Sequence, residues 1–382
     1  MITVPQMPLY WRFKSTSDVV PSDPPERVPF TFDYDSKLNL FIEARSTKLT
    51  ALLDDIYCRH ANVGFLQDGH SLLNTYGADF WRFLSDLLLE YPLKNIVEVG
   101  CGGCVLLERL QSQGFEVLGI DPSPFAAEAG ARKGIKVLQE YFPPKNLDCK
   151  PDLIFQVDVL EHIETPLAFL ESQAACMAEG GIIVVNVPDC SMSLERGDIS
   201  MALHQHVNMF DMISLPTLFM AAGLEVIKLE KSRYGSALYC AARKTKSLNN
   251  APITFDNKRW DRFQSQVSRN IASFKQHIEK ARDSGESIGF FMPQRAFPYL
   301  GMIDWFDDFR IFDNLNMWHK HYLDGISVPV ENQADLGANP VDHIFVMSLT
   351  FGKEVSEALR REIPSIKITT LVEILIEATE KQ

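Results

Sequence analysis

The sequence predicts an α/β fold with a mostly parallel sheet, followed by a second and smaller α/β unit. Between residues 95 and 187, short apolar runs alternate with amphipathic stretches, as in buried parallel strands joined by helices. Two further apolar runs, at 224–231 and 236–243, are separated by only four residues. Because a parallel crossover needs about a dozen residues or more, this last pair of strands must be antiparallel.

The spacing of apolar residues gives the elements in order. In residues 72–91 the apolar positions recur at steps of three and four, which places Phe80, Leu84 and Leu87 on one helical face. Further helices are expected at 104–113, 123–133 and 166–178, and strands at 95–100, 116–121, 135–141, 152–158 and 181–187. The second unit is expected to contain helices at 255–283 and 353–362 and strands at 287–292, 309–312 and 341–348.

The chain of 382 residues is too long for one ordinary hydrophobic core. We expect an N-terminal lobe at residues 1–70, which could act as a lid, a cofactor-binding domain at 71–245 and a C-terminal α/β domain at 252–382. The net charge is -13 and no basic stripe is present. Nucleic acid and anionic membrane surfaces are therefore poor candidates for partners.

Seven scattered cysteines and an N-terminus without a signal pattern predict a cytoplasmic protein with free thiols. No apolar stretch reaches the length of about eighteen residues that a membrane span needs. Cys101 and Cys104 have the spacing of half a zinc site. No second Cys or His pair at matching spacing accompanies them, so no metal is expected.

The strongest signal is the segment 97–104, Val-Glu-Val-Gly-Cys-Gly-Gly-Cys, in which an expected strand runs through glycines into a helix. Glycines let the backbone approach a ligand closely, and the helix offers free N–H groups to an anion. Asp121 closes the next strand, where a carboxylate can accept both hydroxyls of a ribose. A dinucleotide fingerprint needs a third glycine where Val105 stands, which disfavours NAD and FAD.

Together with the segment 156–163, Gln-Val-Asp-Val-Leu-Glu-His-Ile, these motifs resemble the class I S-adenosylmethionine-dependent methyltransferases over roughly residues 75–245. The resemblance implies a Rossmann-like sheet of seven strands, the last one antiparallel, and S-adenosylmethionine as cofactor. The cofactor contacts that it implies are Glu98, Gly100 and Gly102 at the amino-acid end, Asp121 at the ribose, Glu140 and Tyr141 at the adenine and Asp158 and Val159 under the methionine, with Cys101 and Pro122 beside them.

A catalytic base is expected near the strand ends, because methyl transfer requires a positioned acceptor that has lost its proton. His204 and His206 lie just after the fifth expected strand and are the candidates. His206 is the preferred base. For His204, a loop histidine bonded to the backbone is an equally good interpretation.

A second resemblance is to C-methyltransferases that act on nucleotide-activated keto-deoxysugars. It rests on the segments 204–210, 234–238, 312–314, 322–325 and 328–330. The resemblance implies that His206 is the base, that the acceptor is a nucleotide-sugar or another carbohydrate, and that the C-terminal unit is a second Rossmann-like domain. The acceptor contacts expected on this basis are Tyr76, Gln205, Asn208 and Tyr234.

This chain departs from that family in two ways. Residues 1–70 contain only Cys58, so the family's N-terminal zinc module is missing, and Leu203 and Gln205 replace the Tyr and Glu that flank the family's base. A glutamate could raise the basicity of the histidine and a tyrosine could stabilise an enolate. Two alternatives therefore stay open: an O-methyltransferase of another small metabolite, and a non-catalytic binding protein with the same fold.

Overall fold

The computed structural model of the chain describes residues 1–9, 13–14, 27–59, 71–234, 236–245, 256, 258–304, 306, 308–314, 319–323 and 326–380. These residues form two compact units, each assembled from separate parts of the chain. The first unit consists of Met1–Asp33, Ser191–His204 and Asn257–Gln382, and the second of Tyr34–Cys190 and Gln205–Asp256. The second unit contains the glycine segment.

A seven-stranded sheet forms the centre of the second unit. Its strands are β5 (Asn95–Val99), β6 (Glu116–Ile120), β7 (Val137–Leu138), β8 (Leu153–Val157), β9 (Ile182–Pro188), β11 (Leu224–Lys231) and β12 (Ala237–Lys244), in the spatial order β11-β12-β9-β8-β5-β6-β7. β12 runs antiparallel to both of its neighbours, and the other pairs are parallel. The expected sheet of seven strands with a reversed last strand is thereby confirmed.

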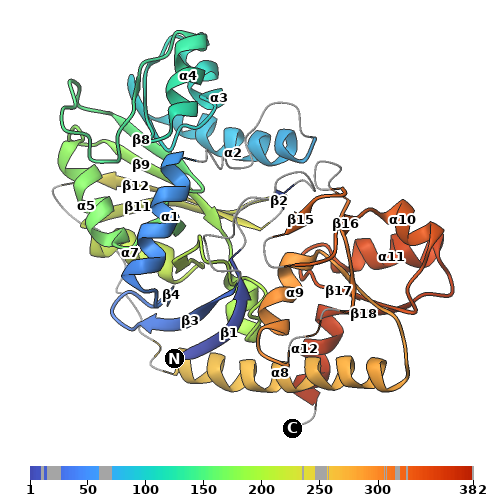
Figure 1. Cartoon of the computed structure of the whole chain (residues 1–382). Coiled ribbons are helices and arrows are strands. Elements are labelled where there is room, and N and C mark those ends of the chain that lie inside the picture. The colour runs from blue at the N-terminus through green and yellow to red at the C-terminus, as the bar shows by residue number, and fades with distance from the viewer. Residues whose placement is uncertain are drawn as a thin grey trace. The chain divides into compact units, whose positions relative to one another are not determined.

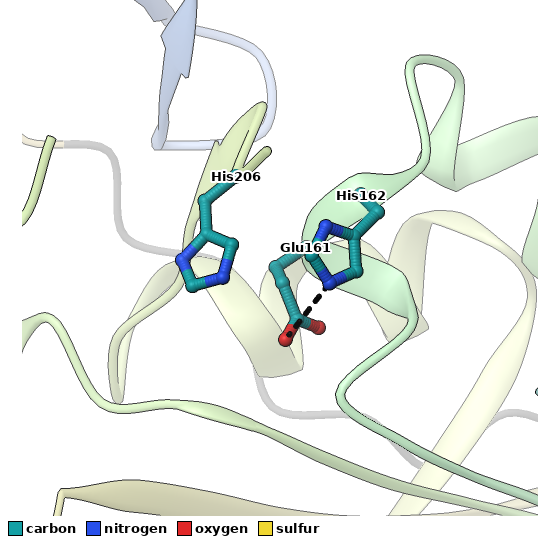
Figure 2. Close-up of side chains that lie close together, drawn as sticks. All are labelled: Glu161, His162 and His206. Atoms are coloured by element: carbon teal, nitrogen blue, oxygen red, sulfur yellow. Dashed lines mark ion pairs between the residues drawn. The ribbon is translucent and has the colours of Figure 1, made fainter. Parts of the chain in front are cut away.

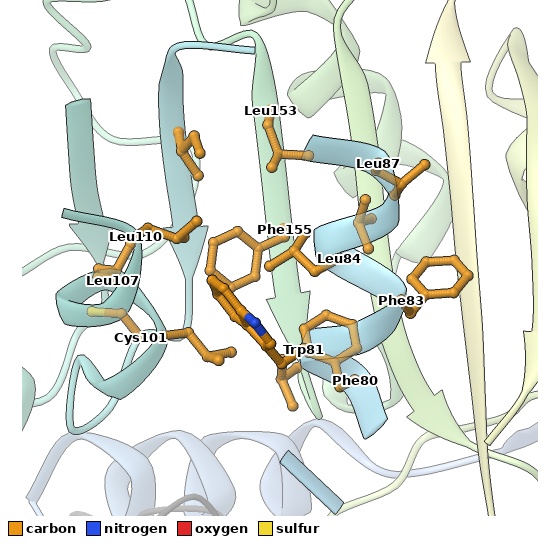
Figure 3. Close-up of a cluster of buried hydrophobic side chains, with 14 of the residues drawn as sticks. Phe80, Trp81, Phe83, Leu84, Leu87, Cys101, Leu107, Leu110, Leu153 and Phe155 are labelled. Atoms are coloured by element: carbon orange, nitrogen blue, oxygen red, sulfur yellow. The ribbon is translucent and has the colours of Figure 1, made fainter. Parts of the chain in front are cut away.

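Helices cover both faces of this sheet (Figure 1). On one face lie α2 (Ser71–Glu90), α3 (Val105–Ser112) and α4 (Pro124–Lys133), whose apolar side chains form one core cluster with the strands (Figure 3). On the other face lie α5 (Pro166–Cys176) and α7 (Ser214–Ala221), which contribute to a second cluster. Burial on both faces explains why the strands read as almost continuous apolar runs.

Helix α2 has the apolar face that its periodicity predicts. Phe80, Phe83, Leu84 and Leu87 are at most 1% exposed, whereas Leu89 on the opposite face is 89% exposed. The strand expected at 135–141 is much shorter, because β7 is an edge strand that pairs with β6 only through Val137 and Leu138. The chain then leaves the sheet.

Smaller elements complete the second unit. β4 (Leu40–Glu43) pairs antiparallel with β10 (Asn208–Met209), so that Ile42 lies opposite Asn208. α1 (Thr47–Arg59) follows β4, and a single 3₁₀ turn, η1 (Leu160–His162), follows β8. The pairing of β4 with β10 places residues 208–209 beside residues 41–42 and so brings the segment around His206 close to β4.

The first unit contains a parallel sheet of five strands in the order β16-β14-β13-β17-β18. These strands are β13 (Ile288–Phe291), β14 (Arg310–Phe312), β16 (Val330–Glu331), β17 (His343–Val346) and β18 (Lys367–Thr370). The helices are α6 (Ser191–Arg196), α8 (Arg259–Asp283), α9 (Pro293–Leu300), α10 (Gln333–Ala338), α11 (Gly352–Glu362) and α12 (Leu371–Glu380). The expected second α/β unit is confirmed.

The N-terminal segment joins this C-terminal sheet in one unit. β1 (Ile2–Pro8) pairs with β3 (Arg27–Asp35), and β2 (Phe13–Lys14) pairs with β15 (Tyr322–Leu323). Val4 of β1 packs so closely on the end of α9 that a Cβ on Gly301 would lie 2.6 Å from its Cγ1. The domain boundaries expected at residues 70, 245 and 252 stay predictions. The side chain of Cys58, residues 246–251 between the two expected domains and residues 324–325 of one sugar-family segment lie outside the described residues.

Within the part of the chain that the structure describes, no helix is both long and apolar enough to cross a membrane.

Two leucines on α2 offer a matched test of this packing. Leu84→Ala is expected to lower the free energy of unfolding by about 2–5 kcal/mol, because it opens a cavity in the core cluster of Figure 3. Leu89→Ala, on the exposed face of the same helix, should change it by less than about 0.5 kcal/mol. Urea denaturation measures both, and equal effects of the two changes would contradict the placement of α2.

Candidate cofactor and acceptor site

Three of the motif segments meet at one edge of the seven-stranded sheet. β6, β5 and β8 are adjacent parallel strands, and their carboxyl ends are followed by Asp121, Gly100 and Asp158 respectively. In open α/β sheets, ligands bind outside the carboxyl ends of the strands. This edge is therefore the candidate site.

The glycine turn after β5 passes very close to the end of β8. Gly100 has a φ of +73°, and its N–H donates a hydrogen bond of 2.8 Å to the carbonyl oxygen of Ile120. A Cβ at this position would lie 2.5 Å from Cγ2 of Val159. Both the dihedral angle and the lack of space require glycine here.

Asp121 holds the glycine turn in place. Its Oδ2 accepts a hydrogen bond of 2.9 Å from the N–H of Gly102, and its Oδ1 accepts one of 2.8 Å from the N–H of Ser123. The side chain is only 8% exposed, and Pro122 follows it at the end of β6. Each carboxylate oxygen keeps a lone pair for a further donor, such as a ribose hydroxyl.

Glu98 is the second carboxyl group at this edge. It is 3% exposed, and no described residue donates a hydrogen bond to its Oε2. Burial raises its pKa well above the ordinary value, and the nearby Cys104 and Asp121 add to this effect. A buried carboxyl oxygen without a donor is costly, so the position suits a ligand that brings a cation or a donor.

The two cysteines of the glycine segment are free thiols. The Sγ atoms of Cys101 and Cys104 lie 3.8 Å apart, and both residues are buried. Cys101 packs under β6, where a Cβ on Gly119 would lie 2.5 Å from its Sγ. Its side chain thus belongs to the core on the face that α3 covers.

The residues expected beside the adenine follow the edge strand β7. Glu140 accepts a hydrogen bond of 2.9 Å from the N–H of Lys145 through its Oε2, and the ring of Tyr141 is 52% exposed. Tyr141 is thus one of the few large apolar side chains that face solvent in the described residues.

Tyr76 of α2 contacts the end of β8. Its hydroxyl lies 3.0 Å from Oδ1 of Asn186 and 3.3 Å from Oδ1 of Asp158, so its single proton is shared between two acceptors. Asp158 has a positive φ of 53°, and its N–H donates to the carbonyl oxygen of Asn186. Burial raises the pKa of Asp158 to about 6 and that of Tyr76 well above its ordinary range. The structure thus joins an expected acceptor contact to an expected cofactor contact.

The two candidate bases lie in different units. His204 is fully buried, its Nε2 lies 3.1 Å from the carbonyl oxygen of Val28, and its ring packs against Phe30. This matches the interpretation of His204 as a histidine bonded to the backbone. His206 belongs to the unit with the glycine turn.

His206 lies beside two residues that follow β8, Glu161 and His162 (Figure 2). The rings of His206 and His162 meet edge to face with centroids 5.0 Å apart, and one ligand atom from each of the three side chains lies within 4.8 Å of the others. The carboxyl group of Glu161 is between the two rings in Figure 2. We call these three residues the Glu-His-His cluster.

Burial sets the protonation of this cluster. It lowers the pKa of His162 to about 4, so the ring is neutral near pH 7. The Nδ1 of His162 lies 2.7 Å from the carbonyl oxygen of Gln205, which can only accept, so the proton is on Nδ1. Glu161 is 1% exposed, and burial, with the nearby Asp158 adding to it, raises its pKa well above the ordinary value.

The other residues expected to contact the acceptor differ in the hydrogen bonds that their side chains already make and in their burial. The Nδ2 of Asn208 donates to the carbonyl oxygens of Leu160 at 3.1 Å and Ile163 at 2.7 Å, so this side chain fixes the turn η1. The side chain of Gln205 is 7% exposed, and its Nε2 has no hydrogen-bond partner among the described residues. Tyr234, between β11 and β12, is half-buried.

A buried ion pair lies at the end of β4, the strand that pairs with β10 just after His206. Glu43 of β4 is 3% exposed, and its Oε2 lies 2.6 Å from a guanidinium nitrogen of Arg45. The N–H of Glu43 donates to the carbonyl oxygen of Val207. Burial raises the pKa of Glu43 to about 7, although Arg45 opposes the shift.

Glu161 and His162 were not among the expected site residues. Within the segment 156–163, the resemblance implies cofactor contacts only for Asp158 and Val159. The adjacent acid and imidazole directly after the strand were the available signal.

Comparison with known proteins finds matches to this part of the chain. Residues 75–229 match the family model described as a methyltransferase domain. The α/β Rossmann-like fold of these residues agrees with this match.

The curated relatives include several ubiquinone biosynthesis O-methyltransferases. The mitochondrial enzyme of Schizosaccharomyces pombe is 25% identical over 151 residues, which are 36% of this chain and 54% of that protein. The enzyme of Bradyrhizobium sp. is 31% identical over 102 residues, 24% of this chain and 39% of that protein. The chain thus spans about half or less of the length of these relatives.

Solved structures similar to this chain are also methyltransferases. The magnesium protoporphyrin IX methyltransferase from Synechocystis is 14% identical with a TM-score of 0.40, over 52% of this chain and 100% of that one. The N-methyltransferase NodS from Bradyrhizobium japonicum is 17% identical with a TM-score of 0.38, over 45% of this chain and 98% of that one.

Gly100 and Gly134 have similar positive φ angles, so substitutions at these two positions separate the effect of a steric clash from the effect of backbone strain. Gly100→Ala is expected to weaken S-adenosylmethionine binding at least about tenfold, because its Cβ would push Val159 and the turn apart. Gly134→Ala, at a φ of +67° with no atom within 4 Å of the added Cβ, carries the strain without the clash. It should lose about 1 kcal/mol of stability and keep the affinity. Calorimetric titration measures the affinities, and equal losses would contradict the close approach.

The Glu43 carboxyl group predicts a pH dependence of stability. Its pKa rises from 4.5 to about 7 on folding, so the folded state binds the proton more tightly. The contribution of Glu43 to the free energy of unfolding is therefore fully present below pH 4.5. It is lost as the pH rises through about 7, by about 1 kcal/mol per pH unit. We expect Glu43→Gln to lack this loss of stability when unfolding by urea is measured at pH values from about 5 to about 8. Parallel curves for the two proteins would refute the assignment.

Proposed function

We propose that the chain is an S-adenosylmethionine-dependent methyltransferase that methylates a hydroxyl group of a small organic molecule, with His206 as the residue that removes the hydroxyl proton. The observation that carries this proposal is the position of His206 in the Glu-His-His cluster, which follows the strand β8 at the same sheet edge as the glycine turn. The names of the curated O-methyltransferase relatives support the hydroxyl acceptor.

The glycine turn and its carboxyl groups suit the cofactor. The Oε2 atom of Glu98 lacks a donor among the described residues and would receive one from the cofactor's ammonium group. The carboxylate oxygens of Asp121 keep lone pairs that can accept hydrogen bonds from a ribose. Gly100 has no side chain and so lets the turn approach Val159 closely. When bound, the cofactor supplies a methyl group activated by a sulfonium.

The chain's own residues then have to position the acceptor and handle one proton. Transfer is an in-line displacement, so alignment of the acceptor oxygen lowers the barrier most. A hydroxyl is a weak nucleophile until its proton is removed. His206 can take this proton, and the positive charge that forms on its ring favours the ionised form of the adjacent Glu161.

Tyr76, Gln205 and Tyr234 are the side chains that we propose as acceptor contacts. The donors of Asn208 are already used by the carbonyl oxygens of η1, so we propose for Asn208 a positioning role. Tyr76 is held against Asp158 and would orient the acceptor at the cofactor end. Gln205 keeps an unused amide donor next to His206.

Methylation of a keto-sugar carbon in a nucleotide-sugar is the second candidate. The resemblance of several sequence segments to the sugar C-methyltransferases favours it. A carbon acid needs stabilisation of its enolate, and Leu203 cannot donate a hydrogen bond for this purpose. A hydroxyl acceptor has no such requirement, which is why we place O-methylation first.

The test begins with the cofactor. S-adenosylmethionine should bind the purified chain in a calorimetric titration, NAD should not, and Asp121→Ala should weaken binding, since this carboxylate fixes Gly102. Acceptor mixtures of phenols, sugars and nucleotide-sugars are then incubated with the cofactor labelled with ¹³C in its methyl group. The carbon chemical shift of the product separates an O-methyl from a C-methyl group. Failure to bind the cofactor would remove the proposal.

The proton-removing role of His206 predicts a specific kinetic effect. His206→Gln is expected to lower kcat by about 10²–10⁴-fold and to leave the affinity for S-adenosylmethionine within about threefold, because general-base catalysis acts on the acceptor. His277→Gln, a histidine of the other unit, is the control and should behave as wild type. Unchanged turnover in His206→Gln would contradict the role.

A further inference from the structure

The Glu-His-His cluster has the composition of a metal site. It offers one carboxylate oxygen and two imidazole nitrogens, all within 4.8 Å of one another and all from one unit of the fold. Figure 2 shows the three side chains turned toward a common point. Two of the ligands are fixed on the turn η1 directly after β8, and the third comes from the segment before β10.

Glu161 is the member that most needs a partner. It is 1% exposed, and neither of its carboxylate oxygens receives a hydrogen bond from a described residue. A buried carboxylate without donors or a cation costs several kcal/mol, so such groups normally are paired or coordinate a metal. A cation bound by one or both carboxylate oxygens of Glu161 would provide this partner.

The tautomer of His162 also suits metal binding. Its Nδ1–H donates to the carbonyl oxygen of Gln205, so its Nε2 presents a lone pair. This lone pair lies 3.7 Å from Oε1 of Glu161, the pair drawn as a dashed line in Figure 2. Ligands bound at about 2.0–2.2 Å in a tetrahedral site are about 3.4 Å apart, close to this separation. A backbone carbonyl on the far nitrogen is also the usual support of a metal-binding histidine.

We propose that Glu161, His162 and His206 together bind one divalent transition-metal ion of the Zn²⁺ type. Two nitrogens and one oxygen suit Zn²⁺, Co²⁺ or Fe²⁺ better than Mg²⁺ or Ca²⁺, which prefer all-oxygen sites. Three protein ligands leave a coordination position open, as in catalytic rather than structural sites. Asn208 supports the site from outside by holding η1 through two backbone carbonyls.

The open position assigns the ion a chemical role, and this role, unlike the site itself, rests on the proposed function. A hydroxyl oxygen of the acceptor binds the ion, which lowers the pKa of that hydroxyl. The proton passes to water, the oxygen forms a bond to the methyl carbon, and the carbon–sulfur bond breaks with its electron pair left on sulfur. If the ion is bound, His206 is a ligand. The inference then replaces the proton-removing role of His206 given above and keeps the rest of the proposed function, the methylation of a hydroxyl group.

Metal binding is tested without an acceptor. The full chain, freed of metal by a chelator, is titrated with Co²⁺ and with Zn²⁺ alone, with calorimetry and visible absorption as readouts. We expect about one ion per chain with a Kd of about 1 μM or lower, and a Co²⁺ spectrum of nitrogen and oxygen ligands. Thiolate bands in that spectrum would instead indicate Cys101 and Cys104 and would overturn the proposal.

The variants are chosen to spare the fold. In His162→Asn, the side-chain amide can still donate to the carbonyl oxygen of Gln205, while the Nε2 ligand is lost. This variant and His206→Gln should each weaken Co²⁺ binding at least about tenfold. His277→Gln, outside the cluster, should bind as wild type. Unchanged S-adenosylmethionine affinity and thermal unfolding in both variants would show that folding is intact.

The outcomes separate this inference from the proposed function. No ion binding by the wild-type chain, or wild-type affinity in His162→Asn, overturns the metal site and leaves the proposal of methyl transfer standing. Ion binding at the cluster by a chain that does not bind S-adenosylmethionine upholds the site and overturns the proposed function. Once an acceptor is found, turnover that survives removal of all metal would overturn the ion's catalytic role.

Discussion

The close approach of the β5 and β8 strand ends is the constraint on which the rest of the site depends. The space beside Gly100 is filled by the side chain of Val159, and a Cβ there would be separated from it by 2.5 Å. Val159 leads directly into η1, which carries Glu161 and His162. The glycine turn therefore packs against the residue that precedes η1, and this contact links the turn to two members of the Glu-His-His cluster.

The same edge collects carboxyl groups that the fold leaves without partners. Glu98 and Glu161 are both nearly inaccessible, and both have carboxyl oxygens that receive no hydrogen bond from the described residues. A core that served stability alone would place apolar residues at these positions. The buried carboxyl groups that destabilise the fold lie at the strand ends, where ligands bind. This is expected for a site in which a bound ligand supplies the partners of these groups.

The sequence predicts the scaffold of this protein better than its chemistry. The helix of Leu84 and the strands around Gly100 follow from apolar periodicity, because burial on one or both faces leaves a local pattern. The cluster does not, because Glu161 and His206 are far apart in the sequence. Tertiary contacts bring them together, among them the hydrogen bonds from Asn208 to η1 and from His162 to the carbonyl oxygen of Gln205. His204 and His206 are two residues apart in sequence and fall in different units, which no local pattern reveals.

The discontinuous assembly of the two units has a consequence for biosynthesis. The first unit takes its strands β1 and β3 from the beginning of the chain and its five-stranded sheet from the last third. During translation, β1 therefore emerges long before the residues that cover it, such as Gly301, have been made. All residues of the second unit have been synthesised once residue 256 has been added, whereas the first unit still needs the residues from 257 onward that form its five-stranded sheet.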